Sequence, residues 1–172
     1  IGADLSLPGT YSILADCNKS FSDIVKHLKE KHGCKKIAFF SANSTKSAEA
    51  LERYDAFTTA LEENDLVFYP ELVMDGQFNY EEAKKLILRR YSTKEDIDFD
   101  SLVCANDLMA AGCMEALQQL GVKIPDDVKI SGFDDAVVSK ISSPKLSTIN
   151  QAIYKQGLKA AELTDTLLNG KS

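Results

Sequence analysis

The chain has 172 residues, of which 44% are hydrophobic and 27% charged, a composition typical of a folded globular protein with one core or two small lobes. Its net charge of −6, from 20 basic and 26 acidic residues, comes without a compensating basic cluster and argues against a nucleic-acid-binding surface. No apolar run is long enough to span a membrane, and no signal peptide is visible.

Four cysteines stand at positions 17, 34, 104 and 113, and none forms a C-x-x-C pair. Cys104 and Cys113 lie among apolar residues and are typical of small core side chains. We therefore expect four reduced thiols, which favours a cytoplasmic protein. Because the chain begins at Ile1 without Met, we also expect it to be part of a longer protein.

Apolar periodicity predicts strands and helices in alternation along the first hundred residues. After a loop over 1–10, the expected elements are a short strand over 11–15, a helix over 19–31 that Gly33 ends, a buried strand over 36–40, a helix over 47–64, a strand over 72–74 and a helix over 80–91. The polar segments 41–47 and 75–78 directly follow two of these strands, so we expect them at the carboxyl ends of a sheet.

The stretch 101–135 predicts a strand, a helix and a second strand, which is the repeating unit of a parallel sheet. Asn106 and Asp107 follow the first strand and can cap the helix, because their side-chain oxygens accept from its first N–H groups. Asp134 and Asp135 follow the second strand. Both pairs therefore lie at the carboxyl edge, where open parallel sheets bind ligands.

The remaining segments are an extended run over 146–149, which ends at Asn150 and Gln151, and a last helix over 154–169. The whole order predicts an α/β fold with a doubly wound parallel sheet and flanking helices. Because polar or aromatic residues follow every strand, we expect a binding cleft there. For Asp107 and Asp126 alone, a helix cap and a turn are the simpler interpretation.

No catalytic constellation is visible in the sequence. His27 and His32 are five apart, which is the wrong spacing for a metal pair on a helix. No G-x-G-x-x-G, Walker or G-x-S-x-G motif follows a strand. Asp134 and Asp135 could form an acid/base pair or a magnesium site, but one ligand-binding carboxylate and one turn residue is the simpler interpretation. We expect no catalytic residue, no metal and no cofactor.

Seven motifs occur in order over nearly the whole chain. They are 33–39 (GCKKIAF), 52–57 (ERYDAF), 75–78 (DGQF), 105–112 (ANDLMAAG), 124–128 (IPDDV), 132–135 (GFDD) and 143–151 (SPKLSTINQ). Together they resemble the effector-binding domain of the lactose-repressor and galactose-repressor (LacI/GalR) family of bacterial regulators. One departure is Gly33-Cys34, where the family usually has Gly-His.

The resemblance implies a two-lobed, periplasmic-binding-protein-like type I fold, with one complete lobe and part of a second. The C-terminal lobe would span 17–150, and 1–16 and 151–172 would belong to an incomplete N-terminal lobe. The first half of that lobe, the last strands and the DNA-binding headpiece of the family would lie outside this chain.

The resemblance also implies that a small-molecule effector, a sugar or a nucleobase-like metabolite, binds in the cleft. The implied ligand contacts are Arg53 of the R-x-x-A-F motif, Phe78 after D-G-Q, Asn106 of A-N-D, Asp134 of G-F-D-D, and Gln151. Their planar polar groups can hydrogen-bond to hydroxyls, and the Phe ring can stack on a sugar or base.

We therefore expect the effector-binding sensor of a cytoplasmic LacI-type transcription regulator. It would be a homodimer, without membrane contact, that reaches DNA only through a domain outside this chain. The alternatives are an extracytoplasmic sugar-binding protein of a transport system, the sensor module of another signalling protein, and a small α/β enzyme. The unpaired cysteines and the 143–151 motif favour the regulator, and an enzyme would need a nucleophile or metal set that we do not find.

Overall fold

Five parallel strands form the centre of the structure, a computed structural model that describes residues 10–13, 16–42 and 47–169. The strands are β1 (Ile37–Ser41), β2 (Val73–Asp75), β3 (Ser101–Cys104), β4 (Lys129–Phe133) and β5 (Ser147–Ile149). They lie in the order β2-β1-β3-β4-β5, and every neighbouring pair is parallel. This doubly wound α/β sheet confirms the predicted fold class.

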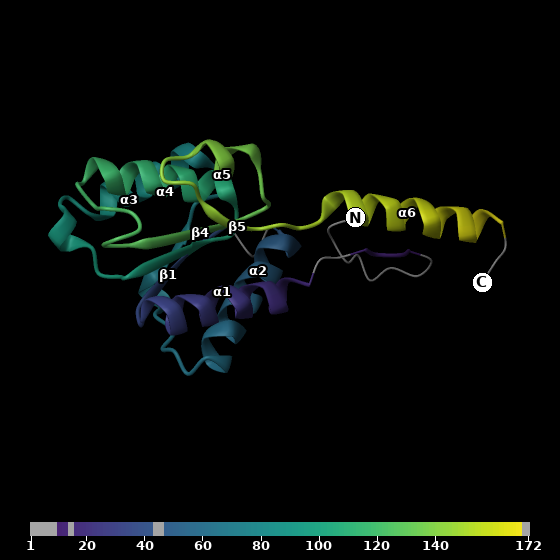
Figure 1. Cartoon of the computed structure of the whole chain (residues 1–172), viewed down its shortest axis with the longest axis horizontal. Coiled ribbons are helices and arrows are strands. Elements are labelled where there is room, and N and C mark those ends of the chain that lie inside the picture. Colours follow the sequence, from purple (N-terminus) through teal and green to yellow (C-terminus); the bar gives the residue numbers. More distant parts are fainter. Residues whose placement is uncertain (1–9, 14–15, 43–46, 170–172) are drawn as a thin grey trace.

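Helices cover both faces of the sheet (Figure 1). On one face α1 (Cys17–His32) packs against α2 (Ala48–Glu63), and on the other α3 (Tyr80–Arg90) packs against α4 (Asp107–Gln119). The short helix α5 (Val137–Ile141) lies beside α4. Two 3₁₀ turns, η1 (Pro70–Leu72) and η2 (Lys94–Asp96), precede β2 and β3.

The last helix, α6 (Ile153–Leu168), extends away from the sheet and its covering helices (Figure 1). Its only buried residue is Gln156, while Ile153, Leu158 and Leu168 are exposed. None of the helices in the described ranges is both long and apolar enough to cross a membrane.

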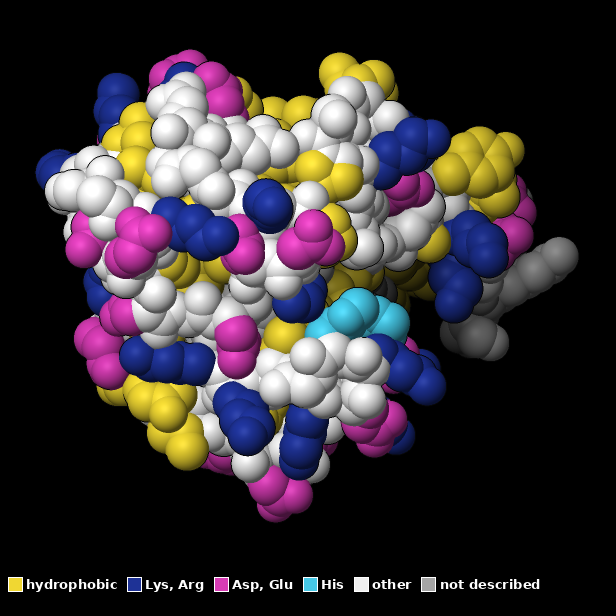
Figure 2. Space-filling view, turned by 60° about the vertical axis from the view of Figure 1, so that its left-hand side comes forward, with side chains coloured by type: hydrophobic (Ala, Val, Ile, Leu, Met, Phe, Trp, Pro, Cys, Tyr) yellow, Lys and Arg dark blue, Asp and Glu magenta, His cyan; other side chains and the backbone are white. Residues whose placement is uncertain are grey.

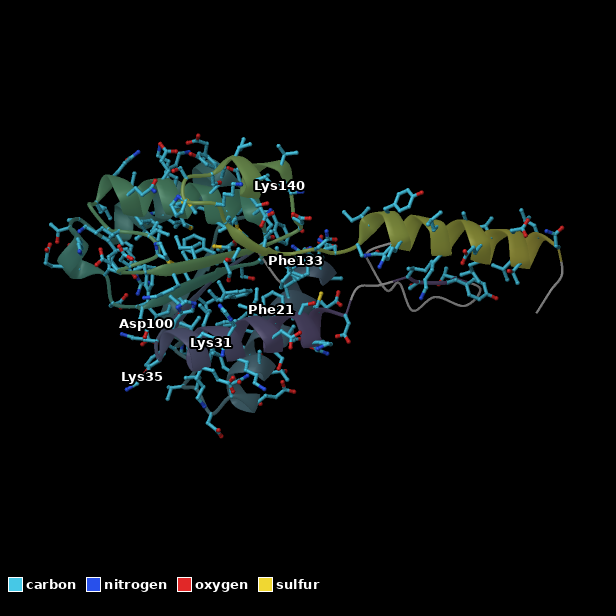
Figure 3. The ribbon with its side chains drawn as sticks, in the orientation of Figure 1. Phe21, Lys31, Lys35, Asp100, Phe133 and Lys140 are labelled. Atoms are coloured by element: carbon cyan, nitrogen blue, oxygen red, sulfur yellow. The ribbon has the colours of Figure 1, made fainter. Side chains whose placement is uncertain are left out.

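The core lies against the central strands, whose residues are buried on both faces. Every residue of β1 and β3 is buried, as the apolar runs in the sequence predict. Phe39 of β1 stacks on Phe57 of α2, with ring centroids 4.4 Å apart. Phe21 of α1 stacks on Phe133 at the end of β4, with centroids 5.6 Å apart (Figure 3). Each buried Phe contributes roughly 1.5–3 kcal/mol to stability, so these rings fix α1 and α2 on the sheet.

Local polar signals set the helix boundaries. The side chains of Asp16, Ser47, Asn79 and Asn106 each accept from a backbone N–H in the first turn of α1, α2, α3 and α4. Gly33 follows α1 in the left-handed conformation, with φ 67°, and ends it as predicted.

Helices α3 and α4 approach each other so closely that one position requires glycine. A Cβ atom built on Gly112 would lie 2.2 Å from the backbone oxygen of Tyr80, well inside contact distance. The small side chains of the A-A-G segment in α4 therefore permit the packing that covers this face of the sheet.

Three local predictions are wrong. A strand was expected over 11–15, but residues 11–13 form none. Tyr11 is 62% exposed and lacks the burial that a strand of this sheet requires. Residues 14–15 lie outside the described residues. Leu72 ends η1 and does not begin β2. Helix α5 was not expected, because its five residues are too few to show a helical period.

Candidate functional site

The carboxyl ends of all five strands lie along one edge of the sheet, because all five strands are parallel. The five residues predicted to contact a ligand come from this edge. Asn106, Asp134 and Gln151 lie just after β3, β4 and β5. Phe78 lies between β2 and α3, and Arg53 lies in α2, which follows β1.

Arg53 links most of this site. It is only 3% exposed, and its guanidinium donates to the backbone oxygen of Ala105 and to the carboxylate of Glu49. The carboxylate of Asp134 lies 3.5 Å from the same guanidinium. The guanidinium also lies over the ring of Phe133, at 4.3 Å, and that of Phe78, at 5.5 Å. Arg53 is thus a buried side chain that several groups of the site share as a partner, and the sequence did not indicate that it would be buried.

Asp134 leaves β4 with a positive φ of 117°, and its backbone N–H donates to the oxygen of Ile149, 2.9 Å away. Its carboxylate accepts from the side-chain amide of Gln151 and faces Arg53. Burial raises the pKa of Asp134 above its ordinary value, although the nearby Arg53 charge acts in the opposite direction. Asp134 and Gln151, two of the ligand contacts that the resemblance implies, therefore lie together.

Asn106 has two partners. Its side-chain oxygen accepts from the N–H of Met109, 2.9 Å away, and caps α4. Its side-chain amide donates to the backbone oxygen of Phe78, 3.2 Å away. Phe78 has a positive φ of 54°, and this bond holds it beside Arg53. All five predicted residues are thus connected through one set of contacts.

Asp107 is not the simple helix cap that we expected. It is fully buried, and its carboxylate accepts from the hydroxyl of Thr148, 2.6 Å away, and from the N–H of Ala136, 2.7 Å away. Burial raises its pKa above the ordinary value. Asp107 joins the start of α4 to β5 and to the segment after β4, while Asp126 lies in a turn as predicted.

The carboxylates of Asp134 and Asp135 have different partners. Asp135, at a positive φ of 55°, is 3.2 Å from the ammonium of Lys140 and accepts from the side-chain amide of Asn150 at 2.7 Å. Asp134 instead faces Arg53 and Gln151. Asp135 is therefore held within the segments that follow β4 and β5, while Asp134 lies among the other predicted site residues and stays a predicted ligand contact.

A groove of about 830 Å³ opens over this edge of the sheet. The residues lining it include Ser47, Glu49, Asp134, Asp135, Gln151 and Ile153. Sequence reasoning missed Glu49, whose side chain is 47% exposed and pairs with Arg53. Its position, four residues before an arginine in the helix after β1, is the signal that could have identified it.

A second groove, of about 500 Å³, lies where α1 meets β4 and β5. His27 and His32 line it and are side by side on the surface (Figure 2). Their Nε2 atoms are 3.2 Å apart, because His32 is the last residue of α1 and its ring reaches back to that of His27. Among the residues that the structure describes, no three His, Cys, Asp or Glu side chains gather as a metal site. All four cysteines are buried and unpaired.

The chain resembles known proteins along most of its length. Residues 25–172 match the periplasmic binding protein-like domain family. The chain is 36% identical, over 138 residues, to the HTH-type transcriptional repressor PurR of Haemophilus influenzae strain PittEE; the alignment covers 80% of this chain and 40% of PurR. It thus spans about two fifths of the length of the curated relatives it matches.

Two solved structures agree with this. The transcriptional repressor ascG of Escherichia coli is similar with a TM-score of 0.79 and 25% identity, over 92% of this chain and 56% of that one. A LacI-type regulator of Bacillus cereus subsp. cytotoxis has a TM-score of 0.77 and 28% identity, over 92% and 55%. The chain belongs to the periplasmic binding protein-like domain family, and within it to the LacI/GalR effector-binding domains.

Proposed function

We propose that this chain is the part of a LacI-type transcriptional repressor that senses a small molecule. The effector is a sugar or a nucleobase-like metabolite, and it binds in the groove over the carboxyl ends of the strands. The repressor acts in the cytoplasm as a homodimer and contacts DNA through a domain outside this chain. The domain binds its effector without catalysing a reaction.

The observation that carries this proposal is the set of contacts around Arg53. Residues from α2, from the segment after β2 and from the ends of β3, β4 and β5 meet there. Carboxylate, carboxamide and aromatic groups in one place suit the hydroxyl groups and flat faces of sugars and bases. The buried thiols support a cytoplasmic location over an extracytoplasmic one.

We further propose that 17–150 forms one lobe and that 1–16 and 151–172 belong to a second lobe. Helix α6 supports this division, because it extends away from the sheet (Figure 1). Its exposed apolar residues include Ile153 and Leu158. A second lobe against α6 would bury these side chains and close the groove from the other side.

The test is calorimetric titration of the full-length repressor with hexoses, amino hexoses, hexuronates and nucleobases. Asp134 lines the groove, and losing a charge-assisted hydrogen bond to it costs roughly 1.5–3 kcal/mol, so Asp134→Ala should weaken binding by about tenfold to a hundredfold. Arg53→Ala should weaken binding by a similar factor, because it releases the carboxylates of Asp134 and Glu49 that Arg53 holds in place. Asp126→Ala, in a turn, should bind as wild type does. Unchanged affinity in both site variants would contradict the assignment.

Catalysis is tested in the same samples. The bound compound, recovered after long incubation, should be chemically unchanged by chromatography. A converted product that disappears in Asp134→Asn would show that the domain is an enzyme.

A further inference from the structure

The positive charge of Arg53 lies beneath the groove and not on its surface. Arg53 is 3% exposed and is not among the residues that line the groove. Its guanidinium is already bound to the oxygen of Ala105 and to the carboxylates of Glu49 and Asp134. An entering ligand therefore meets the two carboxylates before it meets the guanidinium.

The lining of the groove carries three carboxylates, those of Glu49, Asp134 and Asp135, and none of the described residues that line it is basic. Lys140 lies on α5 (Figure 3). Its ammonium is 3.2 Å from the carboxylate of Asp135 and compensates that charge. The other two carboxylates, those of Glu49 and Asp134, share one cation, the guanidinium of Arg53. Among the described residues, one negative charge at the groove therefore remains uncompensated.

The amino end of α2 also opens on this groove, and a helix amino end by itself favours anions. Here that preference is already satisfied. Glu49 lies in the first turn of α2, and the hydroxyl of Ser47 accepts from the N–H of Ala50. An anionic ligand would have to compete with Glu49 at this position, because the Glu49 carboxylate already pairs with the Arg53 guanidinium.

Ionised carboxylates only accept hydrogen bonds, so the ligand must supply the donors. The side-chain amide of Gln151 donates one of its two N–H groups to Asp134, so it compensates that carboxylate only in part. Hydroxyl and amino groups match this lining, whereas phosphate and carboxylate groups place like charges together.

We propose that Glu49 determines which class of ligand the site accepts: neutral or cationic molecules rich in hydroxyl or amino groups bind, and their anionic counterparts are rejected. This inference rests on the proposed function, because it concerns the same groove. It goes beyond it by naming the charge of the effector and the residue that selects it.

The experiment compares matched compounds that differ in charge. Full-length protein is titrated calorimetrically with hexoses, the corresponding 2-amino hexoses, hexuronates and hexose 6-phosphates, and with uracil and its anionic 6-carboxylate, orotate. Wild type should bind the neutral or cationic member of a set at least about tenfold more tightly than the anionic member. Raising the salt concentration should narrow this ratio, because salt screens the repulsion.

Glu49→Gln tests the residue itself, since it removes the charge and keeps the shape. The ratio between neutral and anionic compounds should fall about tenfold in this variant. Glu62→Gln is the matched control, because it makes the same change in the exposed last turn of α2, about 20 Å along the helix. It should leave the ratio unchanged.

Three outcomes are distinguishable. If no compound of any charge binds to wild type, the proposed function fails and this inference with it. If wild type prefers the anionic member, or if Glu49→Gln keeps the wild-type ratio, this inference alone is wrong. If Glu49→Gln does not fold, the salt dependence of the wild-type ratio decides: a ratio independent of salt contradicts the inference.

Discussion

Replacing Arg53 with methionine should destabilise the fold as well as the site, because its guanidinium is a shared partner of three groups. Methionine keeps a long apolar side chain against Phe133 but leaves the Ala105 oxygen without its donor and two carboxylates without their cation. An unsatisfied buried acceptor costs roughly 1–3 kcal/mol, and breaking a fully buried ion pair roughly 3–5 kcal/mol. Because Glu49 and Asp134 remain 47% and 31% exposed, solvent screens part of that loss.

We therefore expect Arg53→Met to lower the free energy of unfolding by about 2–4 kcal/mol at pH 7. For a chain of this size that corresponds to a Tm about 5–15 °C lower. Urea unfolding followed by circular dichroism measures it. Lys140→Met is the control, and its exposed ion pair with Asp135 should cost less than about 1 kcal/mol.

The loss in Arg53→Met should also depend on pH. Without the arginine, the pKa of Asp134 rises further, so protonation relieves the repulsion between the two carboxylates as the pH falls. The destabilisation should be smaller at pH 4.5 than at pH 7. If Arg53→Met lowers the free energy of unfolding by less than about 0.5 kcal/mol, or by the same amount at both pH values, Arg53 is not the shared buried partner of these groups.

Three further predictions concern packing, titration and opening. Gly112→Ala should lower the free energy of unfolding, measured in urea, by roughly 1–3 kcal/mol, because the new Cβ meets the backbone of Tyr80. In the control Gly157→Ala, on α6, the new Cβ has no neighbour within 4 Å, so this variant should be neutral or more stable by up to about 1 kcal/mol. Equal effects of the two changes would contradict the close contact of α3 with α4. Burial raises the pKa of Asp134, so ionisation of its carboxyl group lowers the stability of the fold above that pKa, and the lost stability returns as the pH falls through it. A carboxyl-carbon NMR titration of Asp134 should therefore give a pKa above the ordinary value for aspartate. An ordinary pKa would contradict the burial of this carboxylate. Amide hydrogens at 160–168 in α6 should exchange before those at 109–117 in α4, and equal protection in a monomer would contradict the exposure of α6.

Much of the fold could be predicted because its signals are local. The buried runs of β1 and β3, the caps at Ser47 and Asn106, and Gly33 after α1 all lie within a few residues of the elements they define. The α/β class follows from the alternation of these elements. Short α5 gives no such signal, because its position depends on the buried Asp107 holding the N–H of Ala136.

The site was predictable in its members but not in its arrangement. The motifs indicated Arg53, Phe78 and Asp134, which come together because parallel strands end at one edge. That Arg53 is buried, and that Glu49 lines the groove, depends on how α2 packs against β1 and on the ring of Phe133, at the end of β4, beneath the guanidinium. No local pattern carries that information, since the residues are about 80 positions apart in the sequence.

Residues in the segments that follow β2, β4 and β5 hold their backbone in the region that glycine occupies most easily. Phe78, Asp134, Asp135 and Ala152 all have a positive φ, which is uncommon for residues with a side chain. Replacing Phe78 or Asp134 with glycine would relieve backbone strain and remove a proposed ligand contact in the same step. Selection for a more stable fold would thus favour glycine at Phe78 and Asp134, whereas selection for the proposed effector recognition would retain the present side chains. Drift toward glycine at these positions would mark a descendant of this domain that has lost the proposed effector site.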